Sequence, residues 1–290
     1  MTIGTFARSL RPYQWVKNGV VFAPVICSGR LFEPGALGQA TLSFLCFCAA
    51  SSGAYLLNDV LDRRVDRFHP LKRSRPIATG AFPSRWAVMS ACLLMGGALL
   101  AAAAVHRHLA AAILLYLVLN VIYSTVVKRI VILDVVTLAV GFVIRIWGGA
   151  VVLEIAPSSW LQLSMFFLAL FMGLAKRRQE LVTLHAMARR HRSVLCDYRR
   201  PFIDQLTAIL AAVTIVCYAL YAVSPDVTHR VGTFGFLPTI PVVLYAIFRY
   251  LYLVYVRAGA LDPTEALWSD GPMALAILAW IVAVLCILYR

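Results

Sequence analysis

Long apolar runs recur along almost the whole sequence, and they limit what the chain can fold into. A lipid core about 30 Å thick is crossed by an α-helix of about 20 apolar residues, which satisfies its own backbone hydrogen bonds inside lipid. Barrel strands would instead alternate apolar and polar residues. We therefore predict an all-α polytopic membrane protein, in which residues 1–290 form a single transmembrane helical domain. The nine predicted spans are residues 18–31, 38–58, 86–105, 109–127, 131–153, 159–175, 205–224, 236–256 and 272–289. The first is the weakest, because it is short and contains Pro24 and Gly29.

The charges support a membrane class and an orientation. Only 14% of residues are charged, against about a quarter in soluble domains. Most Lys and Arg residues fall at the N-terminus and in the loops after the even-numbered spans, so the positive-inside rule makes this face cytoplasmic. The net charge of +14 is partly this retention signal, and it also suits anionic lipid or a polyanionic ligand. No nucleic-acid partner is predicted.

The acidic residues gather on the same predicted face, although acids contribute little to topology. At the end of the second span the sequence reads Asn-Asp-Val-Leu-Asp-Arg-Arg-Val-Asp, residues 58–66. Asp59, Asp62 and Asp66 are spaced i, i+3 and i+7, which places them on one helix face. Like charges repel unless a cation lies among them, and Mg²⁺ is usually held by one or two carboxylates plus substrate phosphates. The alternative is a solvated helix end whose aspartates pair with nearby arginines, but ionisable groups beside an apolar span are costly and usually functional.

A cationic segment follows at residues 69–80, which read His-Pro-Leu-Lys-Arg-Ser-Arg-Pro-Ile-Ala-Thr-Gly. Beside an acidic metal site, Lys72 and Arg75 suit a diphosphate, because Arg binds phosphate oxygens through two N–H groups. The alternative is an ordinary positive-inside loop, and the sequence leaves both interpretations open.

Together these two segments resemble the first signature of the UbiA prenyltransferase superfamily, whose members are nine-helix membrane enzymes that use Mg²⁺ to bind a diphosphate. The resemblance implies a UbiA-type bundle. Tyr123-Ser124, Lys128 and Asp134 resemble a second segment of the same superfamily. Members that alkylate aromatic rings usually carry another aspartate-rich motif between spans 6 and 7, where this chain is basic at residues 176–178.

Four further segments together resemble the decaprenyl-phosphate phosphoribosyltransferase subgroup, namely residues 11–18, 141–145, 176–181 and 262–270. That resemblance implies transfer of 5-phosphoribosyl from 5-phosphoribosyl 1-diphosphate to a polyprenyl (decaprenyl) phosphate, with release of diphosphate. It also implies a bacterial inner-membrane location, with the active site facing the cytoplasm.

The resemblance assigns roles to individual residues. The implied Mg²⁺ ligands are Asn58, Asp59, Asp62 and Asp66. The implied catalytic residues are Asp59, Asp62, Asp66 and Asp134. The implied substrate-binding residues are Lys17, Lys72, Arg75, Tyr123, Lys128, Arg145, Lys176 and Arg177. Arg145 lies within a span and needs a partner there; a phosphate and a backbone carbonyl or Glu are both open.

Two rival functions remain. A prenyltransferase of the same fold would move a polyprenyl group from its diphosphate to an aromatic acceptor, which the basic loop after span 6 disfavours. A transporter would place its charged groups near the bilayer midplane, whereas here the acids cluster at one interface. Oligomerisation into a homo-oligomer is left open.

Overall fold

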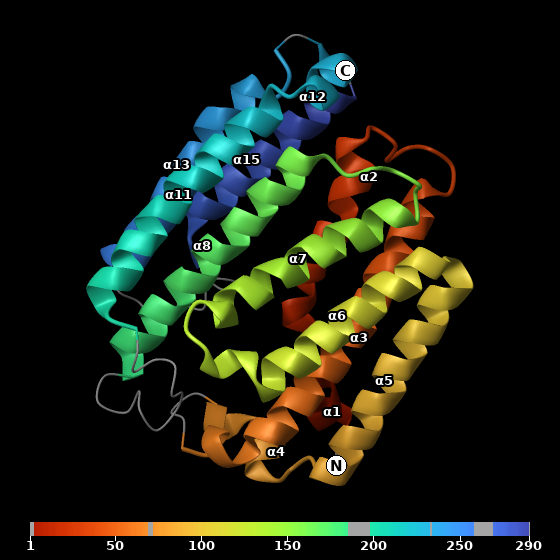
Figure 1. Cartoon of the computed structure of the whole chain (residues 1–290), viewed down its shortest axis with the longest axis vertical. Coiled ribbons are helices and arrows are strands. Elements are labelled where there is room, and N and C mark those ends of the chain that lie inside the picture. The colour runs from red at the N-terminus through yellow and green to blue at the C-terminus, as the bar shows by residue number, and fades with distance from the viewer. Residues whose placement is uncertain (1–2, 69–71, 185–197, 233, 258–268, 290) are drawn as a thin grey trace. The chain divides into compact units, whose positions relative to one another are not determined.

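The computed structural model describes residues 3–68, 72–184, 198–232, 234–257 and 269–289. Every regular element within these residues is a helix (Figure 1), which confirms the all-α prediction. The chain divides into two compact units. The first contains the described residues up to Thr137 together with Ile144–Ala156, and the second contains Leu138–Val143 and most of the chain from Pro157 onward. The single domain over residues 1–290 stays a prediction.

Eight helices in the described residues are long and apolar enough to cross a membrane. They are α3 (Ala36–Asp66), α5 (Ser84–Val105), α6 (Arg107–Thr125), α7 (Leu133–Val151), α8 (Ser159–Leu184), α11 (Arg200–Ala222), α13 (Ile240–Tyr255) with the short η5 (Leu237–Thr239) before it, and α15 (Gly271–Leu288). These agree with the second to ninth predicted spans.

The predicted first span, residues 18–31, is different. It is covered in part by η1 (Pro12–Phe22), a 3₁₀ helix, and by the five-residue helix α2 (Ala23–Cys27). Pro24 has no backbone N–H to donate to a helical hydrogen bond. Gly29 then turns the chain at a positive φ of 74°. The described residues therefore contain eight helices that meet the length and hydropathy of a span, one fewer than the nine predicted.

Short helices complete the first unit: α1 (Ile3–Leu10), η2 (Lys72–Ser74), α4 (Pro76–Thr79) and η3 (Val127–Arg129). A buried apolar cluster joins α3, α4 and α5 through Leu56, Ile77, Phe82, Ala87 and Ala91. Because buried apolar side chains pack closely, this cluster fixes the short helix α4 beside the end of α3 that carries the acidic residues.

Two glycines in α7 allow unusually close packing. A Cβ on Gly149 would lie 2.0 Å from the backbone oxygen of Val21 in η1, and a Cβ on Gly148 would lie 2.4 Å from the Phe47 ring. Small residues let helix backbones approach in this way. Gly149 therefore seats the irregular helix η1 directly against α7, and Gly148 seats α7 against Phe47 of α3.

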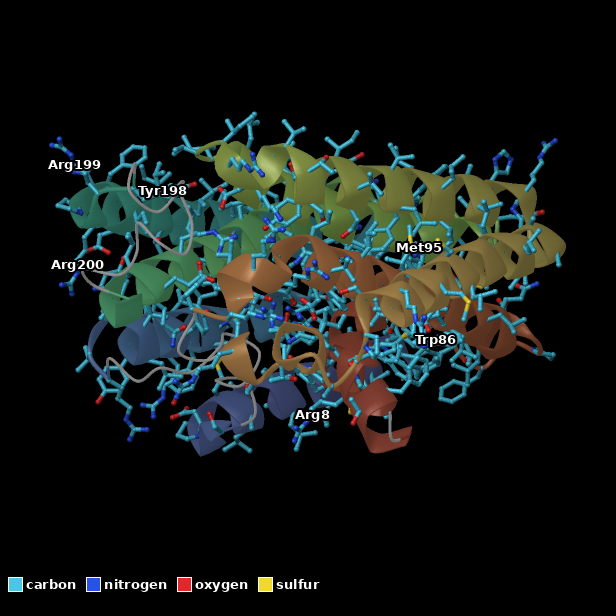
Figure 2. All side chains as sticks on the ribbon, turned by 90° about the horizontal axis from the view of Figure 1, so that it is seen from below. Arg8, Trp86, Met95, Tyr198, Arg199 and Arg200 are labelled. Carbon is cyan, nitrogen blue, oxygen red and sulfur yellow. The ribbon has the colours of Figure 1, made fainter. Side chains whose placement is uncertain are left out.

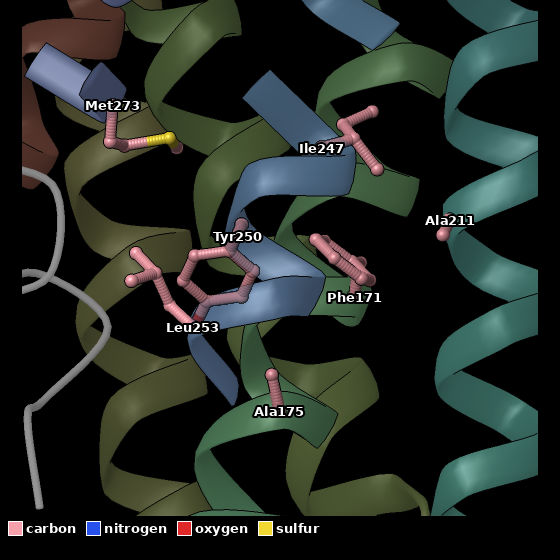
Figure 3. Close-up of a cluster of buried hydrophobic side chains, with 7 residues drawn as sticks. All are labelled: Phe171, Ala175, Ala211, Ile247, Tyr250, Leu253 and Met273. Atoms are coloured by element: carbon pink, nitrogen blue, oxygen red, sulfur yellow. The ribbon is translucent and has the colours of Figure 1, made fainter. Parts of the chain in front are cut away.

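The second unit is a helical group with its own core. At the start of α11, the exposed Arg199 and Arg200 project outward (Figure 2). The core joins α8, α11, α13 and α15, and in it the rings of Phe171 and Tyr250 meet edge to face at 5.4 Å (Figure 3). The remaining short helix of this unit is α12 (Pro225–Val231).

Asp270 secures the start of α15. Its carboxylate accepts hydrogen bonds from Arg249 and from the backbone N–H of Met273. The hydrogen bond from Arg249 is the main reason that the pKa of Asp270 lies below its ordinary value. An anionic cap at a helix N-terminus is favourable, so this residue has a structural role.

Candidate active site

The last turns of α3 carry the acidic face that the sequence predicts. The side chains of Asp59 and Asp66 are only 4% and 5% exposed, whereas Asp62 is 30% exposed. A solvated helix end would leave all three in water. Burying a charge is costly unless it is paired, so the partners of these carboxylates decide what the site can do.

Arg75 joins two of the aspartates. Its Nη1 atom donates to Asp59 Oδ1 at 3.0 Å and to Asp66 Oδ2 at 2.7 Å. Arg75 has extended backbone and Pro76 begins α4, which is the usual arrangement before a proline and at a helix start. Gly80 ends α4 at a φ of 86°. The sequence Arg-Pro-x-x-x-Gly therefore builds a one-turn helix that presents Arg75 to α3.

Lys128 pairs with the third aspartate. Its Nζ donates to Asp62 Oδ1 at 2.5 Å, and the lysine side chain is 11% exposed. Lys128 lies in η3, a tight turn between two spanning helices. The loop between α6 and α7 thus reaches the end of α3 and brings together residues that are 66 positions apart.

Arg11 provides a third cation. Its Nη2 atom contacts both oxygens of Asp59, at 2.5 and 2.6 Å. Burial opposes the charge on Arg11, but the Asp59 carboxylate outweighs it and raises the pKa of Arg11 above its ordinary value. Arg11 belongs to the motif at residues 11–18, but its contact with Asp59 could not be predicted, because nothing local reveals a contact with a residue 48 positions away.

The site contains hard oxygen donors that fit a divalent cation. The buried Oδ1 atom of Asn58 has no hydrogen-bond partner among the residues that the structure describes, and such an orphaned acceptor needs an explanation. Asp62, one helical turn later, stays partly accessible. No three His, Cys, Asp or Glu side chains in the described ranges converge closely enough to hold an ion by themselves, but Mg²⁺ is usually bound through one or two carboxylates plus substrate phosphates.

Arg145 is the centre of a separate buried network in the first unit. Its Nε donates to Asn18 Oδ1 at 2.7 Å and its Nη2 donates to the Tyr116 hydroxyl at 2.8 Å. Its guanidinium also lies 4.6 Å from the centre of the Tyr116 ring. Asn18 in turn donates to Ser51 Oγ at 3.2 Å. Asn18 and Tyr116 could not be predicted as the partners of Arg145, although each is a polar residue beside or within an apolar run.

The other predicted residues lie in several elements. Asp134 is completely buried in the first turn of α7, and Lys17 in η1 and Tyr123 in α6 are half-buried. Lys72 lies in η2 and interacts electrostatically with Asp66.

Lys176 and Arg177 belong to α8 in the second unit, where Arg177 pairs with Glu180 at 2.7 Å. Residues 262–268 of the predicted motif at residues 262–270 lie outside the described residues. Residues 185–197, in the loop after α8, also lie outside them.

Comparisons with known proteins agree with this arrangement. The model of the UbiA prenyltransferase family matches residues 20–181. Decaprenyl-phosphate phosphoribosyltransferase of Mycolicibacterium smegmatis is 31% identical over 283 residues, which cover 94% of this chain and 89% of the relative. The protein of the same name from Mycobacterium tuberculosis is 31% identical over 96% of this chain and 92% of its own length.

A solved structure has the same fold. A UbiA homolog from Archaeoglobus fulgidus, bound to GPP and Mg²⁺, aligns with a TM-score of 0.74 at 19% identity and covers 99% of this chain and all of its own. The family match spans more than half of the 290 residues, and eight described helices are able to cross a bilayer. This chain is a multi-pass membrane transferase that belongs to the UbiA prenyltransferase family.

Proposed function

We propose that the protein transfers 5-phosphoribosyl from 5-phosphoribosyl 1-diphosphate to a polyprenyl phosphate and releases diphosphate. The observation that carries this proposal is the similarity to decaprenyl-phosphate phosphoribosyltransferases over 94% of the chain. The concentration of cations around the acidic end of α3 supports it.

The charges of the site match such substrates. In the first unit, Arg11, Arg75 and Lys128 balance the three aspartates of α3. The donor carries a 5-phosphate and a diphosphate, and the acceptor carries another phosphate. A site that is neutral by itself needs further positive charge to bind these groups, which additional cationic residues and a divalent metal supply.

Asn58, Asp59, Asp62 and Asp66 are the residues that would hold Mg²⁺. When bound, Mg²⁺ would neutralise charge on the diphosphate that leaves. Arg75, Lys128 and Lys72 bind the phosphate oxygens as the bond between ribose C1 and the diphosphate breaks. Electrostatic stabilisation of a leaving group in a site with little water is a large catalytic term.

The remaining assignments concern the sugar, the acceptor and further cations. A phosphate oxygen of the lipid is already anionic, so it attacks C1 without a strong base. Asp134 orients the ribose hydroxyls or stabilises the cationic C1. In the first unit, Lys17, Tyr123 and Arg145 are the further proposed phosphate-binding residues, and Arg145 would do so beside its bonds to Asn18 and Tyr116. In the second unit, the proposed phosphate-binding residues are Lys176 and Arg177. The active site faces the cytoplasm of a bacterial inner membrane, because Lys and Arg concentrate on that face.

Labelled substrates test the reaction. Membranes that contain the protein are incubated with 5-phosphoribosyl 1-diphosphate labelled in the ribose, with polyprenyl phosphate and Mg²⁺. We expect the label to enter the lipid fraction, with a mass increase that corresponds to one phosphoribosyl group. If the label enters a lipid-soluble product only when a labelled prenyl diphosphate and an aromatic acceptor are supplied, the result would support the alternative function as a prenyltransferase. Membranes without the protein give the background.

Replacing Arg75 with Lys tests the cationic part of the site. Arg75 contacts both aspartates through Nη1 alone, so the guanidinium offers further N–H groups to a phosphate, whereas lysine has a single nitrogen for all contacts. We expect R75K to lower kcat/KM for the sugar donor by at least about tenfold. Arg63 is the matched control, because it bonds Ser84 Oγ at 2.9 Å and is exposed. R63K should stay within about twofold, and equal losses in both variants would contradict the assignment.

A further inference from the structure

We propose that Arg11 competes with the divalent cation for Asp59 and thereby sets the metal affinity of the active site. This inference rests on the proposed function, because it takes Asp59 as a metal ligand. It adds a role for a residue outside the acidic motif, on a different helical segment.

The contact between Arg11 and Asp59 occupies the atoms that a metal would need. One guanidinium nitrogen lies 2.5 and 2.6 Å from the two oxygens of Asp59, which is 4% exposed. A divalent cation on the same carboxylate would lie close to this positive charge, and at such distances in a poorly solvated site the repulsion is strong. The two cations therefore exclude one another, so that metal binding requires Arg11 to move.

The backbone around Arg11 indicates that only its side chain needs to move. Ser52 Oγ donates to the Leu10 carbonyl at 3.0 Å and accepts from Trp15 Nε1 at 3.0 Å. Asn18 donates to Ser51. These bonds hold the residues on both sides of Arg11 to α3 independently of Asp59. Metal binding would therefore displace one side chain and leave η1 in place.

Two further features distinguish Arg11 from an ordinary ion-pair residue. Its backbone is left-handed, with φ 53° and ψ 58°, a conformation that residues other than glycine seldom adopt. Its guanidinium also lies 5.2 Å from the centre of the Tyr55 ring. An aromatic face attracts a guanidinium, so the side chain of Arg11 can stay beside the Tyr55 ring after it leaves Asp59.

This coupling is reciprocal. If bound metal weakens the contact between Arg11 and Asp59 by some factor, that contact weakens metal binding by the same factor. Removal of the guanidinium therefore strengthens metal binding. A purely structural role would have the opposite effect, since a disturbed site loses affinity. The sign of the change separates the two roles.

The test measures Mn²⁺ binding to the purified full-length protein in detergent, without substrates, by electron paramagnetic resonance of free Mn²⁺. We expect R11Q and R11G to bind Mn²⁺ at least about tenfold more tightly than the wild type, because Asp59 then loses the cation that contacts both of its oxygens and keeps its bond from Arg75. Glycine suits the left-handed backbone, so R11G keeps the fold if glutamine does not. The matched control is R8Q, which removes the same charge from an exposed residue of the same segment (Figure 2) and should stay within about twofold.

Unchanged or weaker binding in both R11Q and R11G would overturn the competition. Mn²⁺ binding that is insensitive to Asp62→Asn in every variant would overturn the metal assignment, and this inference with it. Failure of phosphoribosyl transfer would refute the proposed substrates while tighter Mn²⁺ binding in R11Q still supported the role of Arg11, so the two results are distinguishable.

Discussion

Replacing Asp62 with Asn is expected to reduce phosphoribosyl transfer to less than about one-hundredth of the wild-type rate. Asn has nearly the same shape as Asp but lacks its charge. In the structure, Asp62 is the most accessible of the three aspartates and pairs with Lys128 at 2.5 Å. The change removes a metal ligand and leaves Lys128 without its anion. Transfer of labelled phosphoribosyl into lipid, at several Mg²⁺ concentrations, measures the effect.

The second unit offers a closely matched control. Asp204 is 32% exposed and pairs with the buried Arg178 at 2.7 Å, while Asp62 is 30% exposed and pairs with the buried Lys128. Both substitutions therefore take a carboxylate from a buried cation and carry a similar cost in stability. We expect D204N to keep most of its activity per folded molecule. A fully active D62N, or two variants with equal losses, would exclude Asp62 as a metal ligand.

The acidic end of α3 could be predicted from sequence because its information is local. The spacing of Asp59, Asp62 and Asp66 places them on one helix face, and in the structure Asp59 and Asp66 share Arg75. The segment around Pro76 also has local turn chemistry. Periodicity and turn residues are short-range signals, so they predict the helix, the short loop and their residue types.

The pairing of charges could not be predicted, because it depends on helix packing. Lys128 approaches Asp62 only because the turn between α6 and α7 meets the end of α3, and Arg11 approaches Asp59 only because η1 is packed on the same helix. The partners of Arg145 follow the same rule. Its guanidinium binds an amide and a phenol from two other segments, whereas the sequence suggested a phosphate, a carbonyl or Glu. A hydropathy pattern indicates that charged residues beside or within an apolar run need partners, but it does not identify those partners.

The first predicted span shows a different limit. A hydropathy pattern counts apolar residues, but the geometry of η1 depends on what it packs against. Val21 is completely buried, and its backbone oxygen faces the helix that carries Gly149. The segment is thus an internal element of the first unit, where it holds Arg11 and Asn18 in position. Small residues such as Gly148 and Gly149 permit close helix packing, but the sequence could not identify η1 as the partner of Gly149.

Replacing Gly149 with Ala is expected to be the most destabilising single-methyl substitution among the helical glycines described. The new Cβ would lie 2.0 Å from the backbone oxygen of Val21, and a backbone atom cannot move aside as a flexible side chain can. Overpacking of this kind costs about 3 kcal/mol, which corresponds to a fall in Tm of roughly 10 °C. Because Arg11 directly precedes η1 and Asn18 lies within it, displacement of η1 should also lower activity. Gly97 in α5 is the control, because a Cβ there meets nothing within 4 Å. Alanine is also a better helix former than glycine by about 1 kcal/mol.

Thermal unfolding in detergent should therefore show G149A melting well below the wild type and G97A at or above it. Equal melting temperatures would mean that η1 does not rest against α7 at this glycine.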